Sequence, residues 1–172
     1  VGSEMCIRDR YIDDIKSIDV LKAKHFDCKV FDDEYLICAR PYLQRFLDFL
    51  FKNFKVSIWT AASKDYALFI INEFILKKNS NRKLHLILYD YHTDASRRIF
   101  KTPKKLEMLW NKWNLKEYND DNTIIVDDLK EVCTSQEKNC ILIKAFEFTH
   151  SEGKYDDSLK RVERALKKWV LT

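Results

Sequence analysis

The chain has 172 residues, enough for one domain with a substantial core, and its 31 lysines and arginines against 27 aspartates and glutamates give a formal charge of +4. Both signs of charge are mixed along the chain, so no clustered basic face predicts direct nucleic-acid binding. The five cysteines include no Cys-x-x-Cys pair, and no apolar run approaches the roughly 20 residues of a membrane span. We therefore expect a reduced, intracellular, monomeric protein that does not contact the membrane.

The N-terminal residues 1–10 have no clear hydrophobic period and resemble translated sequencing-adapter bases, so they are left out of the fold prediction. Residues 11–172 are then a single domain, because no repeat or flexible linker divides them. The polar stretch 11–33 is predicted to be a connecting segment with one short helix.

From residue 35 onward, strands and helices are predicted to alternate. Apolar runs of strand length occur at 35–39, 55–59, 84–89, 124–126 and 140–144. Helices are predicted to begin at Pro41, Ser63 and Pro103, which are residues typical of helix starts. Apolar residues at helical spacing from Leu159 onward predict a last helix at the end of the chain. This order predicts an α/β fold with a mostly parallel sheet and helices on both faces.

Two adjacent acids, Asp127 and Asp128, stand where the strand 124–126 should end. Carboxylates at the carboxyl end of a buried parallel strand lie where open α/β sheets place their active sites. Such a pair suits a hard cation such as Mg²⁺, which prefers oxygen ligands. A solvated acidic turn is the alternative.

Other polar side chains also follow predicted strands. Thr60 follows the strand 55–59, and Ser63 is a good N-cap for the next helix. The Thr60 hydroxyl would then face a helix N-terminus, and the two together could hold an oxyanion. Lys104 is predicted in the first turn of a helix that begins at Pro103, where a cation opposes the helix dipole unless it neutralises an anion. A turn hydroxyl and a solvated lysine are the plainer alternatives. We read Asp90, His92 and Asp94 as loop residues near a cleft, because they provide too few converging ligands for zinc.

Together, the hydroxyl, the ammonium and the acids form a possible phosphoryl site. With Gly2 and Gly153 as the only glycines, a P-loop and a dinucleotide-binding fingerprint are excluded, because both need backbone that approaches phosphate without side chains. Phosphate would therefore be held by side chains and a helix N-terminus.

Five blocks of sequence, in order between about residues 35 and 147, resemble the catalytic domain of the FCP/SCP-type, NLI-interacting-factor-like phosphatases. These blocks are Arg40-Pro41 with Phe46-Leu47, the run 56–67, Lys104-Lys105-Leu106 with Leu109-Trp110, the run 122–128, and the run 139–143 with Phe146. That family belongs to the haloacid-dehalogenase (HAD) superfamily and acts on phosphoserine and phosphothreonine in the C-terminal tail of RNA polymerase II. The resemblance implies a three-layer HAD-like fold, a phosphoprotein substrate and Mg²⁺ as the cofactor.

The resemblance also implies residue roles. Thr60 is similar to the threonine that hydrogen-bonds the transferring phosphoryl group, and Lys104, with Lys105 as the alternative register, to the lysine that neutralises a phospho-aspartate. Asp127 and Asp128 are similar to the acids of the metal site, with Asp128 as the expected direct Mg²⁺ ligand. Ala61 and Ser63, in the turn after Thr60, are candidate substrate-binding residues.

The chain departs from the family at its first motif, Asp-x-Asp-x-Thr/Val, which supplies the nucleophile. Asp-x-Asp occurs nowhere in the sequence, and the adjacent pairs Asp13-Asp14 and Asp32-Asp33 would point to opposite faces of a strand. We expect that the first, central strand, between those that end at Thr60 and Asp127, is missing or replaced. The chain as given is then an inactive, N-terminally truncated phosphatase.

Two other functions stay open. One is a catalytically inactive binding module, like the mitochondrial import-translocase subunit that the chain also resembles, which would place the protein in mitochondria rather than in the nucleus or cytoplasm. The other is a HAD phosphatase with a small-molecule or polynucleotide substrate, because loops rather than the fold set the substrate.

Overall fold

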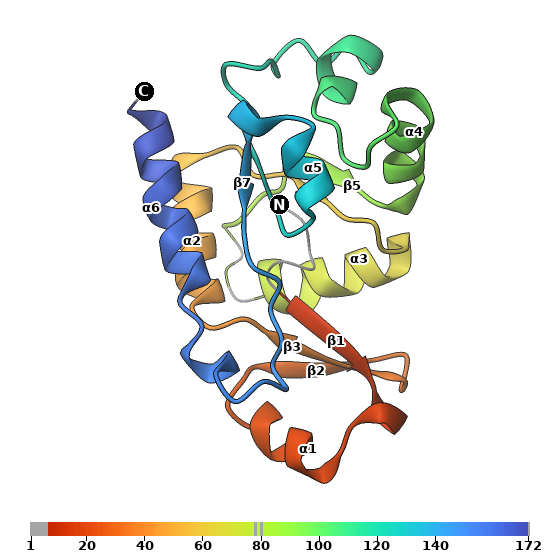
Figure 1. The fold of residues 1–172 in the computed structure, drawn as a ribbon, viewed down its shortest axis with the longest axis vertical. Coiled ribbons are helices and arrows are strands. Elements are labelled where there is room, and N and C mark those ends of the chain that lie inside the picture. Colours follow the sequence, from red (N-terminus) through yellow and green to blue (C-terminus); the bar gives the residue numbers. More distant parts are fainter. Residues whose placement is uncertain (1–6, 78, 80, 172) are drawn as a thin grey trace.

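The protein is an α/β molecule in which a three-stranded antiparallel sheet lies at one end and two parallel strand pairs lie at the other (Figure 1). The structure is a computed structural model that describes residues 7–77, 79 and 81–171. The predicted α/β class and the parallel pairing are confirmed, and the parallel strands form two separate pairs.

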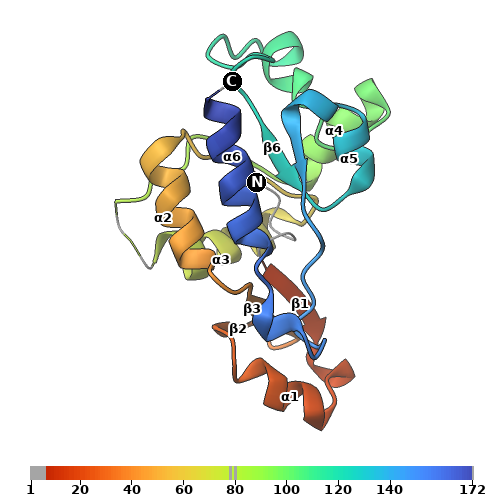
Figure 2. The same cartoon turned by 60° about the vertical axis from the view of Figure 1, so that its left-hand side comes forward.

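The antiparallel sheet is built from the N-terminal part of the chain. Its strands are β1 (Ile7–Tyr11), β2 (Cys28–Phe31) and β3 (Tyr35–Ala39), with β3 in the middle. A short 3₁₀ turn (Ile12–Asp14) and α1 (Ser17–Ala23) join β1 to β2 and lie at the lower end of the molecule (Figure 2).

Residues 1–6 of the segment that was left out of the fold prediction lie outside the described residues. Residues 7–10 form most of β1, and Ile7 is buried in the main core. The expectation for the segment that follows was wrong in part. The segment 11–33 contains the expected helix, but it also contains β2, whose side chains are mostly half-buried and so give no strong hydrophobic signal. The predicted strand 35–39 is confirmed, although both of its neighbours run antiparallel to it.

The main core lies where α2 (Leu43–Asn53) packs beside α6 (Ser158–Val170), and both views show these helices side by side (Figures 1 and 2). Phe46 and Leu50 of α2 and Leu159 and Val162 of α6 are buried there, as their helical spacing predicts. Helix α3 (Lys64–Ile70) continues into a π-helical segment (Ile71–Leu76) whose apolar side chains join the same core.

The parallel pairs carry the candidate site. Strand β4 (Ile58–Trp59) pairs with β5 (Ile87–Leu88), and β6 (Ile125–Asp127) pairs with β7 (Cys140–Leu142). The connections contain α4 (Asp90–Phe100), a π-helical segment (Met108–Lys112), α5 (Lys130–Thr134) and short 3₁₀ turns at Glu137–Asn139 and Gly153–Tyr155. The strands β4, β5 and β7 are shorter than the predicted apolar runs and lie within them. Strand β6 extends one residue past the end of its run, to Asp127.

The segment between β5 and β6 differs from the prediction at two points. Asp90, His92 and Asp94 lie in α4 and not in a loop. Lys104 precedes the next helical segment and has a positive φ of 54°, so it does not lie in the first turn of a helix. The argument from the helix dipole therefore does not apply to Lys104.

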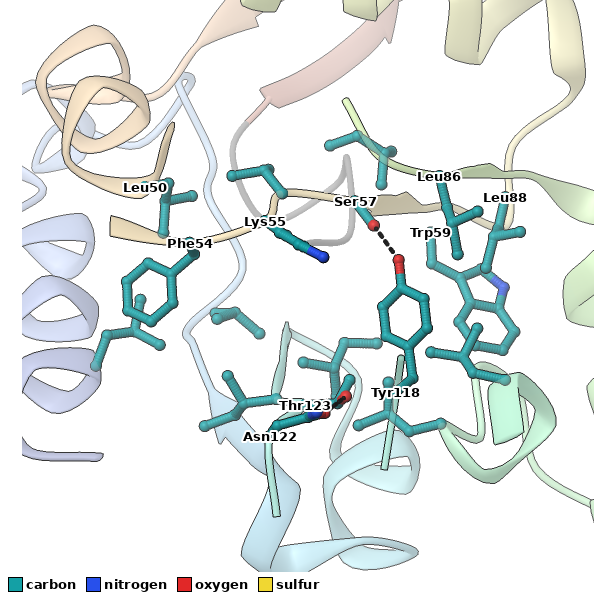
Figure 3. Close-up of a pocket in the computed structure, with 18 of the residues that line it drawn as sticks. Leu50, Phe54, Lys55, Ser57, Trp59, Leu86, Leu88, Tyr118, Asn122 and Thr123 are labelled. Carbon is teal, nitrogen blue, oxygen red and sulfur yellow. Dashed lines mark hydrogen bonds between the residues drawn. The ribbon is translucent and has the colours of Figure 1, made fainter. Parts of the chain in front are cut away.

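A cavity of about 390 Å³ separates the two parallel pairs. Residues 55–59 line one side of it and residues 122–126 line the other, with Leu166 and Trp169 of α6 also contributing. Figure 3 shows Lys55 and Ser57 on one side and Tyr118 and Thr123 on the other. Among the residues that the structure describes, no strand joins β4 to β6.

The cysteines also differ from expectation. Disulfides join Cys28 to Cys38, across β2 and β3, and Cys133 to Cys140, across α5 and β7. The prediction of reduced cysteines is wrong for these pairs, because the fold brings together residues whose sequence spacing forms no Cys-x-x-Cys motif. In the described ranges no helix is both long enough and apolar enough to cross a membrane.

Candidate functional site

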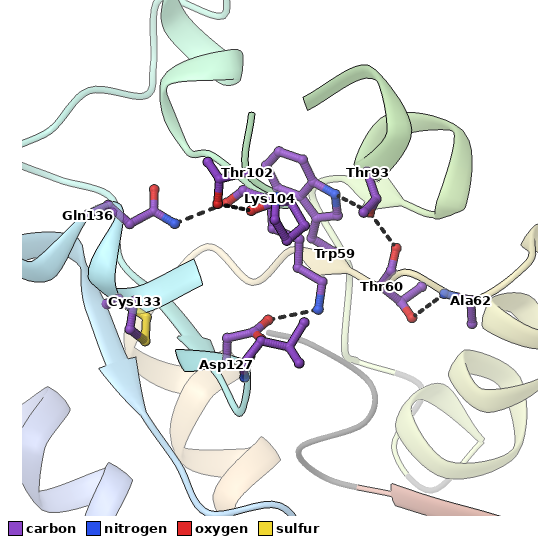
Figure 4. Close-up of polar contacts among 12 residues, drawn as sticks. Trp59, Thr60, Ala62, Thr93, Thr102, Lys104, Asp127, Cys133 and Gln136 are labelled. Carbon is purple, nitrogen blue, oxygen red and sulfur yellow. Dashed lines mark hydrogen bonds and ion pairs between the residues drawn. A yellow bond between two sulfur atoms is a disulfide. The ribbon is translucent and has the colours of Figure 1, made fainter. Parts of the chain in front are cut away.

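A buried ion pair between Lys104 and Asp127 is the centre of the candidate site (Figure 4). The Lys104 Nζ lies 2.8 Å from Asp127 Oδ2, and the two side chains are 1% and 0% exposed. Asp127 is the last residue of β6, whereas Lys104 comes from the segment after α4. Charges this deeply buried are rare unless they are paired, and they are typical of functional sites.

Asp127 uses both oxygens within the protein. Oδ2 accepts from Lys104, and Oδ1 accepts from the backbone N–H of Leu129 at 3.0 Å. The backbone N–H of Leu129, the second residue after β6, thus binds the last side chain of the strand. Asp128, the next acid, is half-buried.

Thr60 lies at the carboxyl end of β4 and is fully buried. Its Oγ1 accepts from the Ala62 backbone N–H at 3.0 Å, and its carbonyl accepts from the Thr93 hydroxyl at 3.0 Å. Trp59 Nε1 donates to the same Thr93 hydroxyl, so α4 fixes the end of β4. Figure 4 shows Thr60, Lys104 and Asp127 around the carboxyl ends of β4 and β6, as the sequence predicted.

The remaining predicted residues have other contacts. Ser63 is exposed and caps α3, accepting from the Tyr66 backbone N–H at 3.4 Å, which confirms the predicted cap. Ala61 is exposed in the same turn. Lys105 donates through Nζ to the Ser135 carbonyl, so the structure places Lys104, and not Lys105, against the acid.

The described residues provide only part of a metal site. No cluster of three or more His, Cys, Asp and Glu that could hold a metal occurs in the described part of the chain. Asp127 binds Lys104 through Oδ2 and the Leu129 N–H through Oδ1, and the half-buried Asp128 follows it directly at the end of β6. One carboxylate does not complete the six-oxygen shell that Mg²⁺ prefers, so further oxygen ligands are required.

His92 lies near this site but belongs to an aromatic cluster. Its ring packs edge-on against Tyr89 and Trp113, and its Nδ1 accepts from the Tyr89 backbone N–H at 3.2 Å. Burial lowers the pKa of His92 below its usual range, against the opposing effects of the Tyr89 backbone and Asp90. His92 is therefore neutral at pH 7.

The sequence analysis missed two side chains that hold the segment around Lys104. Ser96 of α4 and Gln136, which follows α5, form hydrogen bonds with the backbone of residues 102–106. Neither residue lies at a strand end or in a charged cluster. No local pattern could have identified them, because their partners lie between 6 and 32 residues away.

Comparison with known proteins assigns the family. A family model described as NLI interacting factor-like phosphatase matches residues 11–171. The chain belongs to this family. The predicted resemblance to the FCP/SCP-type phosphatases is thus confirmed, and the domain is a CTD phosphatase-like domain.

Similar proteins occur in viruses and in animals. The putative CTD phosphatase-like protein 355R of Invertebrate iridescent virus 6 is 55% identical over 148 residues, which cover 84% of this chain and 81% of that protein. The ubiquitin-like domain-containing CTD phosphatase 1 of Xenopus tropicalis is 27% identical over 158 residues, which cover 89% of this chain and 48% of that protein. The NLI interacting factor-like chain thus spans about half the length of the Xenopus relative.

A solved structure has the same fold. The structure of Fcp1, an essential RNA polymerase II CTD phosphatase, matches with a TM-score of 0.56 at 16% identity. The match covers 98% of this chain and 46% of the Fcp1 chain. The α/β fold of this NLI interacting factor-like domain therefore resembles the matched part of the Fcp1 structure, in agreement with the predicted HAD-like fold class.

Proposed function

We propose that this domain is part of an Mg²⁺-dependent phosphatase that acts on phosphoserine and phosphothreonine in proteins. The observation that carries the proposal is the buried Lys104–Asp127 pair, which lies with Thr60 at the carboxyl ends of two parallel strands. An ammonium held at a fixed position can stabilise charge on phosphoryl oxygens, and catalysis of phosphoryl transfer depends mainly on positioning and on such electrostatic stabilisation.

In the proposed reaction, the bond between phosphorus and the serine or threonine oxygen breaks and the phosphoryl group passes to an aspartate. Water then releases phosphate from that aspartate. Lys104 would neutralise the equatorial oxygens, and Thr60 would donate a hydrogen bond to one of them. Asp128 would contribute to holding Mg²⁺, which supplies further positive charge at the phosphoryl oxygens.

We propose that these 172 residues lack the nucleophile, since they contain no Asp-x-Asp motif. We propose that an additional strand with this motif belongs between β4 and β6. The cavity of about 390 Å³ between residues 55–59 and 122–126 supports this, because it lies where one strand would join the two parallel pairs. The carboxylates of such a strand would also complete the partial metal site.

We propose the C-terminal tail of RNA polymerase II as the substrate, because of the names of the relatives. Relatives from viruses, a frog and a plant are named CTD phosphatases or CTD phosphatase-like proteins. A protein with this substrate would act in the nucleus or the cytoplasm.

The test compares the 172-residue chain with a version to which a strand containing Asp-x-Asp-x-Thr is fused ahead of Ile7. We expect phosphate release from a phosphoserine peptide only with the fused strand and Mg²⁺, and none after EDTA or when the first Asp of the motif is changed to Asn. Hydrolysis by the unmodified chain would contradict the missing nucleophile. A folded fusion protein that binds the phosphopeptide without hydrolysing it would instead support the inactive binding module.

A further inference from the structure

We propose that Gln136 is a positioning residue that fixes Lys104 against Asp127. The proposal rests on the proposed function, in which Lys104 contacts the phosphoryl group. Gln136 itself does not contact the Lys104 amine, so it acts only through the backbone that carries Lys104.

Lys104 needs external support because of its backbone conformation. Its φ of 54° lies in the left-handed region, which residues other than glycine rarely adopt because it strains the backbone. Such a conformation persists only where the surroundings hold it. It also determines the direction in which the long side chain leaves the backbone, toward Asp127.

The Gln136 amide holds the backbone that directly follows the Lys104 Cα. Its Nε2 donates to the Lys104 carbonyl at 3.0 Å, and its Oε1 accepts from the Leu106 N–H at 2.9 Å. One side chain thus satisfies a donor and an acceptor two residues apart. The amide nitrogen can only donate and the amide oxygen can only accept, so the two bonds fix the orientation of the Gln136 amide and the position of the loop backbone.

Ser96 binds the same loop before and after Lys104. Its hydroxyl donates to the Thr102 carbonyl at 2.8 Å and accepts from the Lys105 N–H at 2.9 Å. Ser96 is fully buried in α4. The backbone around Lys104 is therefore bound to α4 by Ser96 and to the turn after α5 by Gln136. Figure 4 shows Gln136 beside Lys104.

Gln136, unlike Ser96, belongs to the same continuous segment as Asp127. Leu129 N–H binds the Asp127 carboxylate, Val132 N–H binds the Leu129 carbonyl, and Gln136 N–H binds the Cys133 carbonyl. This succession of bonds sets the distance between Gln136 and Asp127. When Gln136 binds the Lys104 backbone, it therefore sets the position of Lys104 relative to Asp127.

The test measures how readily the Lys104 amine is acylated in the 172-residue chain, with peptide mapping by mass spectrometry. The exposed Lys116 is the internal reference. Gln136→Met keeps the side-chain length and removes both hydrogen bonds, and Gln136→Glu keeps only the acceptor for Leu106. We expect the Lys104/Lys116 labelling ratio to rise about tenfold in Gln136→Met and less in Gln136→Glu. Glu137→Ala, an exposed change in the same turn, should leave the ratio unchanged.

A double-mutant cycle separates positioning from general support of the loop. If Gln136 acts by holding Lys104 against Asp127, Gln136→Met should change the ratio less than about twofold in an Asp127→Asn background. Equal effects in both backgrounds, or an unchanged ratio in a folded Gln136→Met protein, would overturn the proposal. If circular dichroism shows that Gln136→Met does not fold, the same criteria apply to Gln136→Glu.

Labelling requires no enzymatic activity, so this result does not depend on the proposed function. In the fused, strand-completed protein, the same Gln136→Glu change should lower kcat and leave KM unchanged. A completed protein without phosphatase activity but with the predicted labelling would refute the proposed function and keep the positioning role.

Discussion

At the scale of single residues, the buried Lys104–Asp127 pair has energetic consequences that a surface pair lacks. Exposed ion pairs contribute little, whereas removing one partner of a buried pair leaves an uncompensated charge away from water. Lys104 and Lys105 are adjacent, yet Lys104 binds the Asp127 carboxylate and Lys105 binds the Ser135 carbonyl. Substitutions of Lys105 are therefore a matched control for the same substitutions of Lys104.

We expect Lys104→Met to lower the free energy of unfolding by about 3–5 kcal/mol, because Asp127 would remain buried without its counter-charge. Lys105→Met removes a single partly buried contact to a carbonyl and should cost about 1 kcal/mol. Urea unfolding of both variants gives the comparison. Equal losses in the two proteins would show that the Lys104–Asp127 pair is not isolated from water.

At the scale of elements, a second ion pair joins the end of β3 to the start of α6. Arg40 Nε and Nη2 each donate to the Asp156 carboxylate at 2.9 Å, and the same carboxylate accepts from the Ser158 N–H. Burial raises the pKa of Asp156. The hydrogen bonds from Arg40 and Ser158 and the Arg40 charge outweigh it, so the pKa lies below its usual range.

This shift predicts the acid dependence of stability. The folded pKa of Asp156 is below its unfolded value of about 3.9, so its contribution is present above about pH 4 and is lost as the pH falls through the folded pKa. We expect the free energy of unfolding to fall less steeply below pH 4 in Asp156→Asn than in the unmodified chain. Parallel pH profiles for the two proteins would contradict a role for Asp156 in acid unfolding. The pKa of the neighbouring Asp157 is also lowered, by its hydrogen bond from Arg161, so Asp157→Asn separates that contribution from the contribution of the Arg40 contact.

At the scale of the whole molecule, local sequence patterns predicted the elements better than their pairing. The strands that end at Thr60 and Asp127 follow from apolar runs, and α6 follows from its helical spacing. The antiparallel neighbours of β3 could not be predicted, because strand pairing depends on residues far apart in sequence. The disulfides and the Gln136 contacts were missed for the same reason.

The candidate site was predictable where it depended on strand ends, since the carboxyl ends of parallel strands meet at one edge. The backbone conformation of Lys104 was not, because Thr102-Pro103 also suits a helix start. The left-handed Lys104 depends on Ser96 and Gln136, which no local pattern connects to it.

The central claim is that Lys104, held against Asp127, is the phosphoryl-binding lysine of this domain. The most direct test is the kcat for a phosphoserine peptide in the strand-completed protein, compared between Lys104→Arg and Lys105→Arg. Both variants keep the charge, but the larger guanidinium cannot occupy the Lys104 Nζ position. We predict that Lys104→Arg lowers kcat by about 100-fold or more and that Lys105→Arg leaves it within about twofold. Comparable kcat values for the two folded variants would contradict the account.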